Sequence, residues 1–112
     1  MTYQHKNLAN GRWFELSFIE QMANVGSEVG RTISWKNKGN GDYSQKAFER
    51  ALELLDLTIA DIKNKKRLRE IVRLREVLVD YFAFNNLYGS SDELWNKYFY
   101  AFNFAAAKKF QS

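Results

Sequence analysis

Cysteine and proline are both absent from this chain of 112 residues. Without cysteine, neither a disulfide nor a thiolate metal site can form, and such a composition is typical of proteins of a reducing interior. Without proline, and with only six glycines, there is little to interrupt a helix. These absences favour an all-α fold.

Histidine is nearly absent as well. His5 is the only one, and it lies within residues 1–11, which we expect to form a flexible N-terminal tail. This position removes the usual general base and the usual metal ligand from the folded part. No phosphate-binding loop, dinucleotide-binding fingerprint or G-x-S-x-G elbow occurs either. We therefore expect a protein that binds no cofactor and no metal and is not an enzyme. The alternative is a small helical hydrolase or nuclease that uses carboxylates and arginines.

Long apolar runs are also missing. The opening MTYQHKNLANGRWF lacks the apolar segment of a signal peptide, and no stretch approaches the roughly 20 apolar residues that span a bilayer. The sequence therefore predicts a cytoplasmic protein that does not enter a membrane.

What the chain does contain is helical periodicity in four successive segments. Four helices joined by short connections predict an all-α, single-domain, up-down-up-down four-helix bundle over residues 12–112. The residues expected on the inward faces are Phe14, Phe18, Met22, Val25, Val29 and Ile33 on the first helix; Phe48, Ala51, Leu52, Leu55, Ile59 and Ile62 on the second; Leu68, Ile71, Leu78, Val79 and Phe82 on the third; and Leu94, Trp95, Tyr98, Phe99, Phe102, Ala105 and Ala106 on the fourth.

The ends of these helices carry capping signals. The first helix is expected over residues 13–38 and ends at GNG, where Gly39 suits the position after the helix. The second helix begins with Asp42 or Ser44 as its cap. A short hinge near residue 63 leads to the third helix, and Ser90 with Glu93 predicts a capping box at the start of the fourth.

Gly26 and Gly30 lie four residues apart on the first helix. At that spacing they form a shallow strip along one side of the helix. We expect this strip to let a neighbouring helix or a bulky aromatic side chain approach closely.

Several apolar residues remain after the inward faces are filled. Some of these residues, such as Leu54, Trp13 and Trp35, lie outside the apolar stripes of their helices. Six others, on the second, third and fourth helices, together suggest a surface for self-association. The alternative is that one chain wraps tightly enough to bury them. The candidate self-association residues are Leu57, Val77, Tyr81, Phe84, Tyr100 and Phe104.

Arg75 is the opposite anomaly, because its position falls within the apolar arc of the third helix. A buried guanidinium needs a carboxylate partner, and Glu15 and Asp56 are the candidates. The pattern predicts a buried ion pair that is structural, or alternatively functional.

The stretch KNKKRLREIVRLR, residues 63–75, concentrates positive charge. It holds seven basic residues and one acid, a net charge of +6, whereas the whole chain carries +4. Cations at a helix start are unfavourable, so an anionic partner would relieve them. Two interpretations stay open: a solvated helix start, which the lack of aromatic residues among the lysines favours, or a site for an anionic partner, either nucleic acid or an acidic protein. The candidate anion-binding residues are Lys63, Lys65, Lys66, Arg67, Arg69 and Arg73.

Two family resemblances follow from these segments. The runs NGRWFELSFIEQMANVGSEVGRTISWKNKGNGDYSQKAFERALELLDLTI, RLREIVRLREVLVDYF and NNLYGSSDELWNKYF resemble a group of small uncharacterised prokaryotic four-helix proteins over nearly the whole chain. The A-x-E-L-L-x-L segment at 51–57 and the R-L-x-x-I-x-x-L-R segment at 67–75 are similar to proteins encoded in ribosomal RNA intervening sequences. Those proteins are similar in turn to the accessory variability proteins of retroelements. The second resemblance covers about the middle half of the chain and implies a homo-oligomer with a basic surface that binds nucleic acid.

A third comparison is informative because it fails. The helical HEPN ribonucleases resemble this chain in architecture, but their active site needs an arginine followed four to six residues later by histidine. No arginine here has such a partner.

Overall fold

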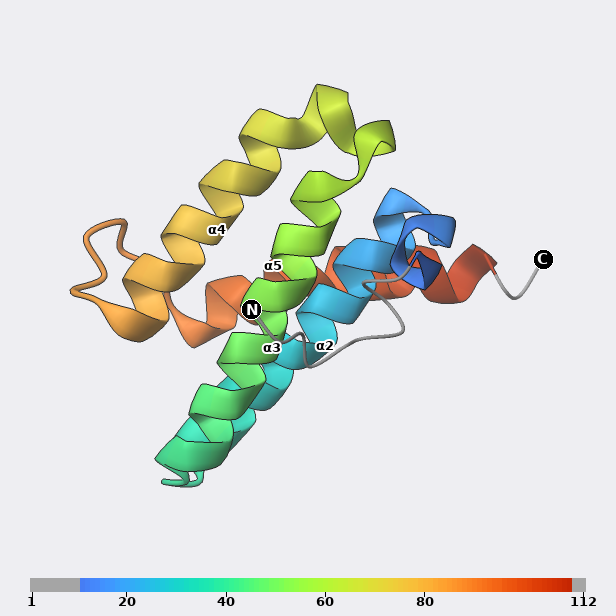
Figure 1. Cartoon of the computed structure of the whole chain (residues 1–112). Helices are drawn as coiled ribbons and strands as arrows, with labels where there is room; N and C mark the ends of the chain where they lie inside the picture. Colours follow the sequence, from blue (N-terminus) through green and yellow to red (C-terminus); the bar gives the residue numbers. More distant parts are fainter. Residues whose placement is uncertain (1–10, 110–112) are drawn as a thin grey trace.

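Four α-helices and two short 3-10 helices make up the protein in this computed structural model, which describes residues 11–109. The expected tail, apart from Gly11, therefore lies outside the described residues, as do His5 and residues 110–112. The all-α, up-down-up-down prediction is confirmed (Figure 1). The elements in chain order are η1 (Arg12–Glu15), α2 (Phe18–Asn37), α3 (Gly41–Ala60), η2 (Ile62–Arg67), α4 (Leu68–Ala83) and α5 (Asp92–Lys109).

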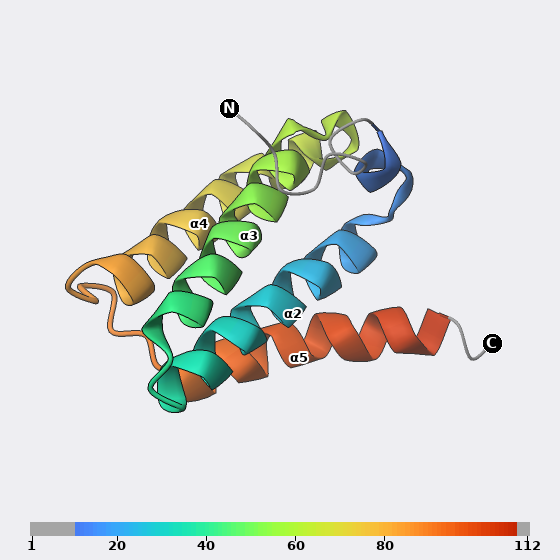
Figure 2. The ribbon, with the colours of Figure 1, turned by 60° about the horizontal axis from the view of Figure 1, so that its bottom comes forward.

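The helices are not equivalent in their packing. α3 packs against α2 on one side and against α4 on the other, and the three helices run alternately up and down (Figure 2). α5 packs chiefly against α2 and crosses it obliquely (Figure 2). One end of the molecule therefore holds the α2–α3 turn, and the other end holds η1 and η2.

The first helix starts later than the sequence predicted. Leu16 is extended and separates η1 from α2, and the Ser17 hydroxyl accepts from the Glu20 amide at 3.1 Å. The Glu20 carboxylate accepts from the Ser17 amide in return, which completes a capping box. Because the break turns Phe14 outward, this residue is 38% exposed and its expected place in the core was wrong.

Two other caps differ by one or two residues from the prediction. The Asn40 side chain caps α3 by accepting from the Tyr43 amide at 3.0 Å, so Asp42 and Ser44 were the wrong candidates. At α5, the Ser91 hydroxyl, rather than that of Ser90, accepts a helix amide. The expected role of Gly39 is confirmed, because its φ of +78° is a backbone conformation that favours glycine.

Most of the residues expected in the core are buried or half-buried, with a few exceptions. Ile62 is exposed because α3 ends at Ala60, before the stripe reaches it. Leu54 and Leu57 are buried, contrary to expectation, because α3 lies between two helices and buries two sides. Leu68 and Leu94 are also exposed. The buried apolar cluster comprises Trp13, Met22, Val25, Val29, Ile33, Phe48, Ala51, Leu54, Leu55, Leu57, Ile71, Leu74, Leu78, Trp95 and Phe99.

Gly26 allows the close approach of α5 to α2. A Cβ atom at this position would lie 2.8 Å from the Cβ of Phe99, closer than carbon atoms pack. Gly30 differs, since a Cβ there meets nothing within 4 Å. The expected approach of an aromatic side chain is thus confirmed at Gly26 and not at Gly30.

This difference gives a matched pair of substitutions. Gly26→Ala should lower the free energy of unfolding by about 1–3 kcal/mol, because the added methyl forces α2 and α5 apart. Gly30→Ala should raise it by about 0.5–1 kcal/mol, because alanine favours a helix and has room here. Urea unfolding of both variants measures the two changes, and equal effects would contradict the packing of Phe99 on Gly26.

Candidate functional site

The exposed cations gather at the end of the molecule where η2 meets α4. All six candidate anion-binding residues are exposed. They occupy η2 and the first turns of α4, at the opposite end from the α2–α3 turn (Figure 1). We call this group the basic corner: Lys63, Lys65, Lys66, Arg67, Arg69 and Arg73.

A buried polar network holds the backbone of the basic corner. The side-chain amide of Gln21 donates to Asp61 Oδ2 at 2.7 Å, and the side-chain amide of Asn64 donates to Gln21 Oε1 at 2.8 Å. The same side-chain amide of Asn64 also donates to the backbone carbonyl of Thr58 at 3.0 Å. These side chains are all nearly inaccessible to solvent, so α2, the end of α3 and η2 are bonded to one another inside the protein.

The network continues into η1. Trp13 Nε1 donates to Thr58 Oγ1 at 3.1 Å, and the Gln21 amide also donates to the Trp13 carbonyl at 3.0 Å. η1 is thereby bonded to Gln21 of α2 and to Thr58 of α3. We call Trp13, Gln21, Thr58, Asp61 and Asn64 the polar clasp. None of these five residues was predicted to belong to a site, although Gln21 falls three residues after Phe18 and four before Val25, on an otherwise apolar face.

Asp61 connects the polar clasp to the basic corner. Lys63 binds the Asp61 carboxylate through its ammonium group, and its backbone amide donates to Asp61 Oδ1 at 3.1 Å. Burial alone would raise the pKa of Asp61, but the bonds from Lys63 and Gln21 outweigh it and hold the pKa below its usual value. The carboxylate therefore stabilises the fold above its usual pKa and loses this contribution as the pH falls through the lowered value.

The cations of the basic corner differ in what they contact. The Lys63 ammonium also donates to the Phe14 carbonyl at 3.1 Å. Arg67 lies 4.5 Å from the ring centroid of Phe18, and Arg73 lies 4.7 Å from that of Tyr88. The stretch of residues 63–75 contains no aromatic residue, but the fold places aromatic rings from other parts of the chain beside these two arginines.

Three cations of the basic corner lack such contacts. Within residues 11–109, Lys65, Lys66 and Arg69 form no ion pair or hydrogen bond. Half of the basic corner is therefore available to an external anion.

The single acid of the stretch, Glu70, lies near Tyr98 of α5. Burial, together with the negative charge of Glu70, raises the pKa of the Tyr98 hydroxyl.

Arg75 does pair with a carboxylate, but the pair is not buried. Its Nε lies 2.8 Å from Asp56 Oδ1, and its Nη2 lies 3.4 Å from Oδ2. The two side chains are 36% and 49% exposed, so the expected buried ion pair was wrong. The partner is Asp56 rather than Glu15, which lies on η1. A pair this exposed contributes at most about 1 kcal/mol.

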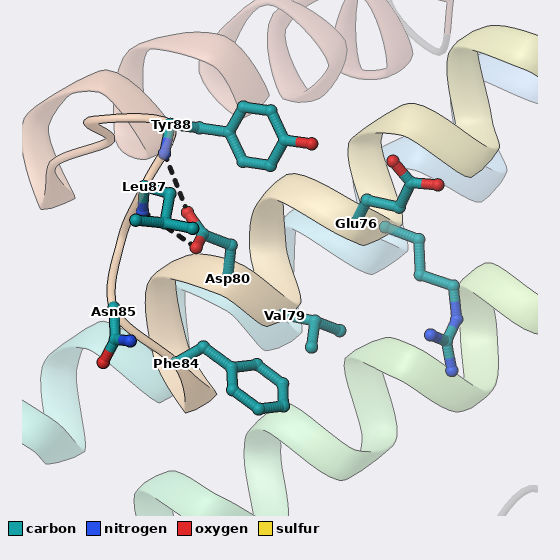
Figure 3. A pocket seen from close by; sticks show the side chains of 8 residues that line it. Glu76, Val79, Asp80, Phe84, Asn85, Leu87 and Tyr88 are labelled. Carbon is teal, nitrogen blue, oxygen red and sulfur yellow. Dashed lines mark hydrogen bonds between the residues drawn. The ribbon is translucent and has the colours of Figure 1, made fainter.

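An apolar groove lies beside the end of α4. It has a volume of about 470 Å³ and is lined by Val79, Phe84, Leu87 and Tyr88 among others (Figure 3). The Asp80 carboxylate accepts from the backbone amides of Leu87 and Tyr88 at 2.9 and 3.0 Å, as the dashed lines in Figure 3 show. These bonds hold the loop in place while Phe84 and Leu87 remain 70% and 86% exposed. We call this feature the Phe84 groove.

The candidate self-association residues fall into three groups. Phe84, Tyr100 and Phe104 are exposed, as a contact surface requires. Val77 and Tyr81 are half-buried against the core. Leu57 is buried, so its expected place on an outer face was wrong.

Lys36, Tyr81 and Asp92 join α2, α4 and α5 at the other end of the molecule. The Lys36 ammonium lies 2.7 Å from Asp92 Oδ1, and the Tyr81 hydroxyl donates to the same oxygen at 2.6 Å. Burial would lower the pKa of Lys36, but the bond to Asp92 outweighs it and raises the pKa. Burial also raises the pKa of Tyr81. Near neutral pH the amine is therefore charged and the hydroxyl is neutral.

Between residues 11 and 109, none of the helices combines the length and the apolar character that a membrane span requires. No three acidic or histidine side chains in this range lie close enough together to hold a metal ion.

Comparison with models of protein families, with curated proteins and with solved structures found no match to this chain. The family resemblances of the sequence therefore stay predictions.

Proposed function

We propose that this chain is a non-enzymatic helical interaction module that binds nucleic acid through the basic corner and self-associates. The observation that carries the first part is the set of exposed cations on a backbone fixed from inside by the polar clasp. A fixed array of positive charges can neutralise neighbouring phosphates with little loss of backbone entropy on binding.

The energetics of the basic corner favour an anion. Arg67 occupies the cap position of α4 and makes no capping hydrogen bond there. The positive charges lie at the N-terminus of α4, where the helix dipole is also positive, at a cost of about 0.3–1 kcal/mol each at low salt. Arg69 and Arg73, four residues apart, repel each other slightly. Phosphate groups at this corner would remove both unfavourable interactions.

Nucleic-acid binding through the basic corner predicts a salt dependence that two substitutions should weaken. The logarithm of the affinity should fall linearly with the logarithm of salt concentration, with a slope near −0.9 per duplex phosphate neutralised or about −0.7 for a single strand. Lys66→Gln with Arg69→Gln should make this slope shallower by up to about two phosphates. Fluorescence anisotropy of a labelled oligonucleotide at several salt concentrations measures it.

The matched control for this experiment removes two other charges. Lys97→Gln with Lys108→Gln changes the net charge equally, but both lysines lie on α5, outside the basic corner. This control should keep the wild-type slope. Equal effects of the two double variants, or no binding by the wild type at low salt, would contradict the proposal.

The non-enzymatic part of the proposal has its own support. A lysine nucleophile or a tyrosinate base needs a lowered pKa, whereas Lys36 and Tyr81 have raised values. The carboxylates nearest to arginines are already neutralised: Asp56 by Arg75, and Glu28 by Arg31 and Arg50. The alternative, a hydrolase of carboxylates and arginines, would need one of these pairs to open.

Self-association has a separate basis in the Phe84 groove. An exposed aromatic ring beside an apolar concavity is typical of contact surfaces between chains. Tyr100 and Phe104 on α5, whose rings stack at 6.2 Å, offer a second exposed aromatic surface. We propose that Phe84 contributes to contacts between copies of the chain.

Phe84→Glu should shift the protein toward a monomer without unfolding it, because the side chain is 70% exposed. Sedimentation velocity at tens of micromolar measures the shift, and circular dichroism checks the helices. Leu94→Glu is the control, since Leu94 is 57% exposed but lies on α5 away from the groove lining. A wild-type protein that sediments as a monomer would refute self-association.

A further inference from the structure

A second group of aromatic and basic side chains lies at the opposite end of α3 from the basic corner. Trp35 near the end of α2 and Tyr43, Lys46 and Arg50 on α3 line a cleft of about 230 Å³. None of these lining residues is acidic. The cleft lies at the α2–α3 turn, which Figure 1 shows far from η2. We call it the Trp35 cleft.

The two rings in the Trp35 cleft pack against each other, and Tyr43 is the more exposed of them. Trp35 and Tyr43 pack edge to face with their centroids 4.9 Å apart, and Tyr43 is 49% exposed. Exposed lysines lie over them: Lys38 is 5.0 Å from the Trp35 ring, and Lys46 is 5.8 Å from the Tyr43 ring. A lysine has a long flexible side chain, so each can leave its ring for a nearby anion.

Arg50 adds a cation whose position is set by an ion pair. Its Nε lies 3.2 Å from Glu28 Oε2, and Arg31 Nη1 lies 2.8 Å from the other oxygen of Glu28. Both oxygens of Glu28 are therefore engaged. Within the described part of the chain the terminal nitrogens of Arg50 form no further bond. They can donate to a phosphate without giving up the pair.

We propose that the Trp35 cleft binds one unpaired base and its phosphate from a single strand of nucleic acid. The base would stack on Tyr43, the more exposed of the two rings, close enough to Trp35 to quench its fluorescence, and the phosphate would lie between Lys46 and Arg50. A volume of 230 Å³ is below the roughly 300–1,000 Å³ of pockets that enclose a larger ligand, so it suits one planar group. In a duplex the faces of the bases are covered by their neighbours. This inference rests on the proposed function and adds a preference for single strands.

Stacking on an aromatic ring distinguishes this mode of binding from attraction to charge alone. It contributes to affinity for an unpaired base and not for a duplex. Tyr43→Leu keeps an apolar side chain beside Trp35 but removes the ring. This variant should bind a labelled oligo(dT) about tenfold more weakly and a duplex within twofold of the wild type. Lys66→Gln with Arg69→Gln should instead weaken both.

Tryptophan fluorescence gives a second readout of the Trp35 cleft. Trp13 and Trp95 are buried at 1% and 6% exposure, so Trp35 is the tryptophan that a base can reach. Oligo(dT) should quench part of the emission of the wild type, and Trp35→Leu should lose that quenching. Circular dichroism melting shows whether either variant still folds.

The possible results separate the two proposals. If Tyr43→Leu binds oligo(dT) like the wild type, or loses single strand and duplex equally, the Trp35 cleft is not a base site while the basic corner stands. If the wild type binds neither, both proposals fail. If Tyr43→Leu instead weakens binding to poly-glutamate alone, the ligand of the Trp35 cleft is an acidic peptide, which also overturns the inference.

Discussion

The polar clasp is the constraint on which the rest of this structure depends. Gln21, Asp61 and Asn64 bond to one another within the protein, and through Trp13 and Thr58 they join η1, α2, α3 and η2. Each polar group would be costly to bury alone, so each is stable only while its partners are present. The network therefore favours one backbone conformation at the η2 end of the molecule, and in that conformation the six cations of the basic corner lie at the surface.

The two ends of α3 then acquire different surfaces by different means. At the η2 end, buried hydrogen bonds hold the backbone, and five of the six exposed cations have no acidic partner within residues 11–109. At the α2–α3 turn, an edge-to-face pair of rings lines an open cleft, and the ion pair with Glu28 holds Arg50 beside it. Positive charge alone binds single-stranded and double-stranded nucleic acid, whereas an aromatic ring that stacks on bases favours single strands. Under the two proposals, the basic corner would bind phosphates at one end of α3 and the Trp35 cleft would bind an unpaired base at the other.

Periodicity predicted the four helices and most of their buried faces, because a helix that buries one side repeats its apolar residues every 3.6 positions. It missed features set by long-range neighbours. Leu54 and Leu57 are buried because α3 lies between two helices, and Phe18 reaches Arg67 only through the fold. It also misplaced the caps, since Asn40, Asp42 and Ser44 offer similar side-chain oxygens within five residues. The polar clasp left one signal, a glutamine on an apolar face, and two of its partners, Asp61 and Asn64, lie 40 and 43 residues away in the sequence.

The exchange of backbone amide hydrogens at Lys63 and Asn64 tests the polar clasp most directly. The amide of Asn64 donates to the Asp61 carbonyl at 3.0 Å, and that of Lys63 donates to the Asp61 carboxylate. If the clasp fixes the basic corner, NMR at neutral pH should find both amides protected about as strongly as those in the last turns of α3. Exchange at the rate of an unstructured peptide, while α3 stays protected, would show that the corner opens on its own and would contradict this account.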